Sequence, residues 1–140
     1  MGAVRFLIVM LIYSLGAGVA PARADNALLD RWYWALFNVD RGVLSELLSD
    51  NALIELEDLG VTQTKMEFIA ALDEWEDVAE TANFAWQIDA EATQDASQAT
   101  ALVCYQFPGN DLMVRDFFTF DEGIITGSVQ STVGDTCEDF

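Results

Sequence analysis

The sequence contains no histidine, only six basic residues and only two cysteines among 140 residues. The absence of histidine excludes a Ser-His-Asp triad, a Cys-His pair and an HExxH zinc site. Any catalysis would depend on carboxylates, tyrosine, lysine, arginine or backbone amides. The two cysteines, Cys104 and Cys137, form no CxxC motif, which disfavours a catalytic or metal-binding thiol. We therefore predict no metal site and no cofactor.

The first 24 residues have the pattern of a secretory signal peptide. Arg5 gives a positive n-region, residues 6–20 form an apolar run of about 15 residues, and Ala22-Arg23-Ala24 is a small-x-small cleavage signal. This run is shorter than the roughly 20 residues that span a bilayer, which favours cleavage over a membrane span. We predict a periplasmic or secreted protein with one mature domain, residues 25–140. In an oxidising compartment its two cysteines are expected to form a disulfide.

The expected mature chain is strongly acidic. Without Arg5 and Arg23, four basic residues remain against 24 acidic ones, which gives a net charge of −20. Such a surface repels phosphate backbones and anionic lipid headgroups, so we predict no nucleic-acid binding and no stable membrane anchor after cleavage. No segment matches the D-x-[DN]-x-[DN]-G calcium loop, and the acidic run 73–77 is interpreted as the end of a helix.

Hydrophobic periodicity predicts three helices and a strand-rich second half. Asp25 or Asn26 is expected to cap a first helix, Asp40 a short second helix that stops near 49–51, and Thr64 with Glu67 a third. Period-two alternation predicts strands over 52–57, 84–88, 100–107, 112–120 and 124–131, with turns at 108–110 and 121–123. This order predicts an α+β fold, an antiparallel meander with three helices on one side.

Two segments resemble the nuclear-transport-factor-2-like, or SnoaL-like, superfamily. Residues 31–40 and 47–52 resemble its helix-helix-strand opening, and residues 116–125 (DFFTFDEGII) resemble its late hairpin. The resemblance implies a cone-like curved antiparallel (mixed) sheet packed on the three N-terminal helices, with a pocket at the open end of the cone. It also implies dimerisation through the outer face of the sheet. Members include ketosteroid isomerase, polyketide cyclases, dehydratases, epoxide hydrolases, transport factors and association domains, so the fold does not select a function.

Ketosteroid isomerase uses a general-base aspartate, a tyrosine and a protonated aspartate. In an ungapped comparison of the opening helices, Trp32 falls at the tyrosine position and Leu56 at the general-base position, whereas Asp116 matches the protonated aspartate. One of three functional residues is retained, which disfavours steroid isomerisation. Polyketide cyclases of this fold use a histidine or aspartate base, and only Asp116 could serve here.

Alternation and the resemblance together place nine residues inside the cone. They are Trp32, Leu36, Leu56, Trp86, Val103, Tyr105, Asp116, Phe118 and Phe120. Two interpretations remain open: an apolar pocket for a small hydrophobic molecule, or rings that fill the cone of an association module. The catalytic alternative is an acid-base isomerase, cyclase or dehydratase that uses Asp116 and Tyr105, with Glu55 or Glu57 as second ionisable group. In a pocket, desolvation would raise the pKa of Asp116.

Cys104 alternates with Val103 and Tyr105 along its strand, so we expect its side chain to face away from the pocket. Pairing with Cys137 would fold the acidic tail, residues 138–140, over the outer face of the sheet. For a loop of this length the disulfide would stabilise the fold by roughly 3–4 kcal/mol. We therefore predict a structural rather than a reactive disulfide.

Overall fold

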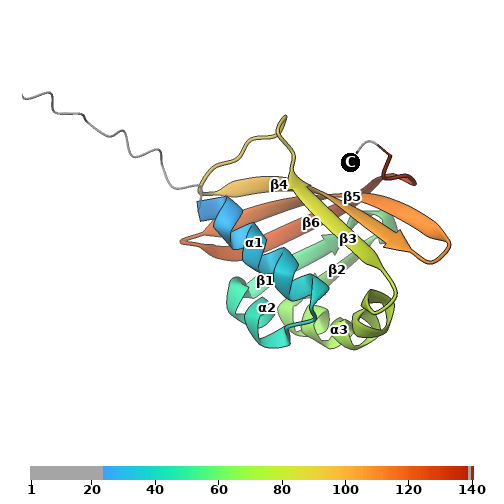
Figure 1. Cartoon of the computed structure of the whole chain (residues 1–140). Helices are drawn as coiled ribbons and strands as arrows, with labels where there is room; N and C mark the ends of the chain where they lie inside the picture. The colour runs from blue at the N-terminus through green and yellow to red at the C-terminus, as the bar shows by residue number, and fades with distance from the viewer. Residues whose placement is uncertain (1–23, 139) are drawn as a thin grey trace, which may run out of the picture.

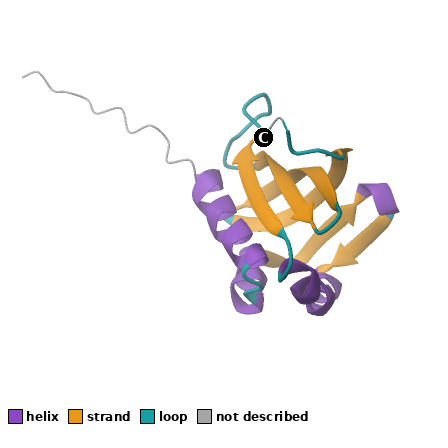
Figure 2. Ribbon diagram, turned by 45° about the vertical axis from the view of Figure 1, so that its right-hand side comes forward, coloured by secondary structure: helices purple, strands orange, loops and turns teal. Residues whose placement is uncertain are grey.

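The computed structural model describes residues 24–138 and 140; apart from Ala24, the predicted signal peptide lies outside the described residues. They form a six-stranded sheet and three helices, with the helices on one side of the bent sheet (Figures 1 and 2). The helices are α1 (Ala24–Phe37), α2 (Arg41–Leu47) and α3 (Lys65–Ala79), with a short 3-10 helix η1 (Glu57–Leu59). The strands are β1 (Leu48–Leu56), β2 (Val61–Thr64), β3 (Asn83–Ile88), β4 (Gln98–Phe107), β5 (Asn110–Asp121) and β6 (Ile124–Gly134). The predicted α+β cone is confirmed.

The sheet is mixed, with the strand order β2-β1-β6-β5-β4-β3. Strands β3 to β6 form the predicted antiparallel meander. The last strand, β6, then lies parallel to β1, and β2 pairs antiparallel with the other edge of β1. The parallel pair therefore joins the opening helix-strand segment to the meander. Among the described residues, no helix is long and apolar enough to cross a membrane.

The predicted caps fix the starts of two helices. The side chain of Asp40 accepts from the N–H of Val43 at 3.1 Å, and Thr64 and Glu67 form a reciprocal capping box at α3. At the end of α1, Val39 has a φ of 55°, and the N–H of Asp40 donates to the carbonyl of Ala35 at 2.8 Å. This arrangement ends many helices, usually with glycine at the left-handed position, and here it turns the chain directly into α2.

Three details differ from the sequence-based expectations. β1 begins at Leu48, directly after α2, instead of at residue 52. The sequence does not predict β2, because four residues, mostly exposed and half of them threonine, are too short to show a period. The acidic run 73–77 lies inside α3 instead of ending it, and Asp73 and Glu76 pair with Arg41 at 2.7 and 2.9 Å. These ion pairs connect α3 to the start of α2.

The predicted disulfide is present. Cys104 of β4 is bonded to Cys137, and their Cα atoms lie 5.8 Å apart. Val103 and Tyr105, on either side of Cys104, belong to the hydrophobic core. Because side chains alternate in direction along a strand, the disulfide lies on the other face of β4, as expected. The bond ties the segment after β6 to β4, the strand next to the edge strand β3.

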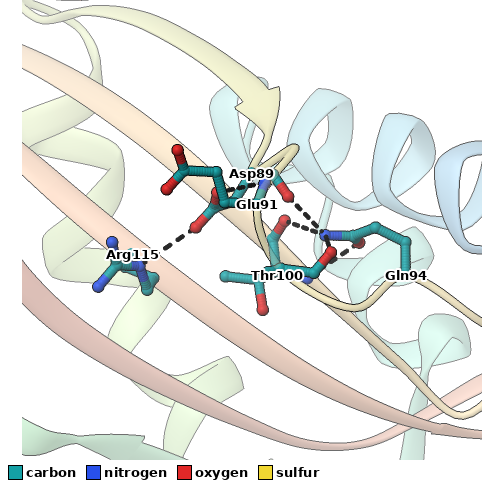
Figure 3. A network of polar contacts seen from close by, with 6 residues as sticks. Asp89, Glu91, Gln94, Thr100 and Arg115 are labelled. Carbon is teal, nitrogen blue, oxygen red and sulfur yellow. Dashed lines mark hydrogen bonds and ion pairs between the residues drawn. The ribbon is translucent and has the colours of Figure 1, made fainter.

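A hydrogen-bond network anchors the connection between β3 and β4, residues 89–97 (Figure 3). The Nε2 of Gln94 donates to the carbonyls of Asp89 at 2.9 Å and Thr100 at 3.1 Å, and its Oε1 accepts from the N–H of Thr100 at 3.1 Å. Asp89 also pairs with Arg115 of β5 at 3.4 Å. One glutamine thus satisfies backbone groups at both ends of the loop and holds it to the sheet.

Candidate functional site

The interior of the cone divides into two regions along β5. The inward-facing residues Asp116, Phe118 and Phe120 are buried in the core, whereas Leu112 and Val114 line a cavity of about 280 Å³. The boundary falls between Asp116 and Val114, which are successive inward positions of one strand. We call the two regions the packed half and the cavity half.

Aromatic side chains from the helices and the sheet fill the packed half. Trp32 stacks on Phe68 of α3, with ring centroids 5.5 Å apart, and meets Phe118 edge-to-face at 5.9 Å. Tyr33 stacks on Trp86 of β3 at 4.8 Å. Such offset and edge-to-face pairs contribute beyond the area they bury. In this half, the bulky rings fill the cone, as one of the two open interpretations expects.

A buried acid lies in the packed half. The hydroxyl of Tyr33 donates to Oδ2 of Asp116 over 2.6 Å, and both side chains are fully buried. Within the described part of the chain, Oδ1 of Asp116 has no protein partner. Burial raises the pKa of Asp116 to about 7, although the hydrogen bond from Tyr33 acts in the opposite direction. The neutral, protonated form of this carboxyl therefore persists to a higher pH than in an exposed aspartate.

The tyrosine that contacts Asp116 is Tyr33, which sequence reasoning missed. The ungapped comparison selects its neighbour Trp32, which packs on Phe68 instead. Consecutive helix residues point about 100° apart, and both of these are buried, so hydrophobic spacing does not show which one faces the carboxyl. A one-residue shift of the comparison would have found Tyr33. Burial, and then the charge of Asp116, raise the pKa of Tyr33 well above its usual value, so it remains a proton donor.

The cavity half is lined mainly by apolar side chains of α1, α3 and the strands. The lining residues are Leu36, Leu56, Gln63, Phe68, Ala71, Leu72, Trp75, Tyr105, Phe107, Leu112, Val114 and Gln130. The indole N–H of Trp75 donates to the carbonyl of Leu36 at 2.7 Å. This carbonyl is in the last turn of α1, where helix carbonyls need partners outside the helix. The hydrogen bond holds the Trp75 ring in the cavity wall.

Three of the nine predicted pocket residues line this cavity: Leu36, Leu56 and Tyr105. The other six lie in or against the core outside its lining; they are Trp32, Trp86, Val103, Asp116, Phe118 and Phe120. Alternation along a strand predicts which side chains face inward, but it does not predict how deep in the cone each of them lies. The stripe of Phe68, Leu72 and Trp75 along α3, visible in the sequence at helical spacing, was the available signal for the missed wall.

The cavity lining contains polar groups but no charged side chain among the described residues. Its polar groups are the amides of Gln63 and Gln130 and the hydroxyl of Tyr105. Glu55 and Glu57, expected as a second ionisable group, are exposed and lie outside the lining. The described residues contain no cluster of three or more acidic or cysteine side chains placed to hold a metal ion. The site is therefore suited to binding by shape, apolar contact and neutral hydrogen bonds.

No family model and no curated protein matches the sequence. Solved structures are similar in fold. An NTF-2-like protein of unknown function from Burkholderia xenovorans is 14% identical, with a TM-score of 0.66 over 78% of this chain and 82% of that chain. A steroid delta-isomerase from Pseudomonas aeruginosa is 19% identical, with a TM-score of 0.62 over 81% of each chain. An LEH-like epoxide hydrolase from M. tuberculosis is 17% identical, with a TM-score of 0.57 over 79% and 83%. This chain therefore has the nuclear-transport-factor-2-like fold, and identities this low show the fold alone.

Proposed function

We propose that this protein binds a small, mainly apolar molecule in the cavity half. The supporting observation is an open cavity of about 280 Å³ with an apolar, partly aromatic wall and no charged lining residue among those described. Small-molecule sites typically combine apolar walls with a few polar groups. An apolar cavity of about 150 Å³ holds benzene, and by that scale this cavity corresponds to a ligand of about 11 non-hydrogen atoms.

The alternatives receive less support. An association module needs no interior space, yet only the packed half is filled. An acid-base enzyme needs ionisable groups at the ligand, and Asp116 lies outside the cavity lining. Tyr105 does line the cavity, but burial raises the pKa of its hydroxyl well above the usual value. A proton transfer at neutral pH is thus harder to support than binding.

The proposal is tested with naphthalene, a ten-carbon probe, by following the indole N–H signals of the ¹⁵N-labelled mature chain by NMR. The Trp75 signal should shift with saturation, because its indole is part of the cavity wall. The exposed Trp34 indole should not respond. The absence of a saturable Trp75 shift would contradict the proposal.

A matched pair of variants locates the site. Ala71→Phe places a ring in the cavity and should abolish the naphthalene response, since Ala71 lines it. Ala70→Phe, at an exposed neighbouring position of α3, should bind as the unmodified protein does. Equal binding by both variants would show that the probe occupies another part of the molecule.

We also propose that the chain is exported and begins at Asp25 after cleavage. The supporting features are the apolar run 6–20, the cleavage signal before Asp25 and a disulfide, which persists in oxidising compartments. Full-length protein expressed in a Gram-negative host should appear in the periplasmic fraction with Asp25 as its N-terminal residue and without free thiols. Ala22→Phe, which enlarges a small position of the signal, should block cleavage. Uncleaved cytoplasmic protein with reduced cysteines would contradict export.

A further inference from the structure

Three neutral polar side chains in the apolar wall have no hydrogen-bond partner among the described residues. Within the part of the chain that the structure describes, the side chains of Gln63, Gln130 and Tyr105 make no hydrogen bond to protein, although all three line the cavity. None of their atoms is both buried and unpartnered, so water can reach these groups in the open cavity. A hydrocarbon that displaces this water leaves them without a partner, which costs free energy. A ligand that supplies a matching polar group recovers that cost, whereas a pure hydrocarbon does not.

Gln130 has a particular position among the three. It lies directly opposite Asp116 on β5 and next to Leu56 on β1. Directly opposite residues of antiparallel strands have Cβ atoms about 4.5–5.5 Å apart. Gln130 is thus a cavity-lining residue that borders the buried acid. It also lines a second hollow of about 250 Å³ beside η1, so it stands where the two hollows meet.

We infer that the cavity selects an uncharged amphiphile, an apolar body with one hydroxyl or carbonyl group that the side-chain amide of Gln130 binds. This inference rests on the proposed function. An amide both donates and accepts, so it can serve either group. A carboxylate ligand would lose its hydration without gaining a cationic partner, inside a mature chain whose net charge is −20. An ammonium ligand would meet no carboxylate in the lining of the 280 Å³ cavity. Asp58 lines the adjoining hollow, where its carboxylate already accepts from the backbone N–H of Thr132.

The experiment compares four naphthalene probes at pH 6 by the Trp75 indole signal: 2-naphthol, naphthalene, 2-naphthoate and 2-naphthylmethylammonium. One added hydrogen bond corresponds to roughly 2- to 10-fold in affinity, so 2-naphthol should bind tighter than naphthalene by that factor. Both charged probes should bind more weakly than naphthalene. This ranking is measured on the unmodified protein and needs no variant.

Gln130→Met keeps the side-chain length and removes the donor and the acceptor. It should remove the preference for 2-naphthol, so that the two probes bind the variant within about twofold of each other. Gln106→Met, at an exposed position of β4, is the matched control and should preserve the preference for 2-naphthol.

The outcomes separate this inference from the proposed function. If neither naphthalene nor 2-naphthol shifts Trp75, the proposed function is wrong. If both bind equally, or if a charged probe binds best, the cavity binds apolar molecules but the uncharged-amphiphile class is overturned. If the preference for 2-naphthol persists in Gln130→Met, the assignment to Gln130 is overturned.

Discussion

The packed half and the cavity half of the cone share β5 but differ in the helix that supplies most of the facing side chains. In the packed half, α1 places Trp32 and Tyr33 against the rings of β3 and β5. In the cavity half, α3 faces the sheet with residues that include the small Ala71, and Leu112 of β5 remains half-buried. The sheet offers inward side chains in both halves. The size and position of the helix side chains therefore decide which half is filled.

The largest difference between the halves should appear in core truncations. We expect Phe118→Ala to lower the free energy of unfolding by about 3–5 kcal/mol, because the ring is fully buried against Trp32 and Tyr33. Leu112→Ala, in the half-buried cavity wall, should cost about 1 kcal/mol. Urea denaturation at pH 6 measures both values. Equal losses would show that the two halves are equally well packed.

A second difference is the pH dependence that the packed half confers through Asp116. Its pKa is about 7 in the folded chain against a usual 3.8, so between these values the folded state binds more protons than the unfolded state. The free energy of unfolding should therefore fall as pH rises from about 4 to about 7, by at most roughly 4 kcal/mol. Asp116→Asn keeps an acceptor for Tyr33 and should remove this slope in urea titrations. The exposed Asp121→Asn is the control, and an unchanged slope in Asp116→Asn would refute the assignment.

A third difference between the halves should appear when the hydroxyl of each buried tyrosine is removed. Tyr33→Phe deletes the donor to Asp116 and should cost about 1–3 kcal/mol, with the larger loss at pH 8, where the acceptor is charged. Tyr105→Phe deletes a hydroxyl without a partner among the described residues and should cost less than about 0.5 kcal/mol. Urea denaturation at pH 5 and pH 8 provides the test. A similar loss for both variants would contradict the contrast.

The smallest expected difference is between two tryptophans, one in the cavity wall and one exposed. Trp75→Phe removes the hydrogen bond to the carbonyl of Leu36 and should lower the free energy of unfolding by about 1 kcal/mol. Trp34→Phe, at an exposed position of α1, should stay within about 0.5 kcal/mol. Thermal unfolding of both variants at one pH is sufficient. If Trp75→Phe were as stable as Trp34→Phe, the indole would not hold α3 to α1.

Local chemistry made much of the fold predictable. The caps at Asp40 and Thr64 and the turns at 108–110 and 121–123 follow from short-range signals that tertiary structure did not override. The disulfide joins residues 33 positions apart and was predictable because the chain has only two cysteines. The short strand β2 carries too few residues for a period, and only its pairing with β1 defines it. That pairing depends on tertiary contact, which the sequence alone does not show.

The site was less predictable than the fold for a geometric reason. Alternation identified Asp116 and Tyr105 as inward-facing, but whether an inward position is filled or open depends on the helix residue opposite it. Tyr33 against Asp116 and Ala71 in the cavity wall are two such opposing positions. Neither pairing leaves a periodic signal in the chain. The direction of the Asp116 pKa shift was predictable because burial alone causes it.

The parallel pairing of β1 with β6 also bears on the order of folding. Because β6 lies between β1 and β5 in the sheet, the opening segment cannot join the meander until residues 124–134 have been synthesised. Contacts between such distant parts of a sequence slow folding. We therefore expect the sheet to remain open until β6 has been synthesised. If the chain is exported, that delay would leave time for translocation before the sheet closes.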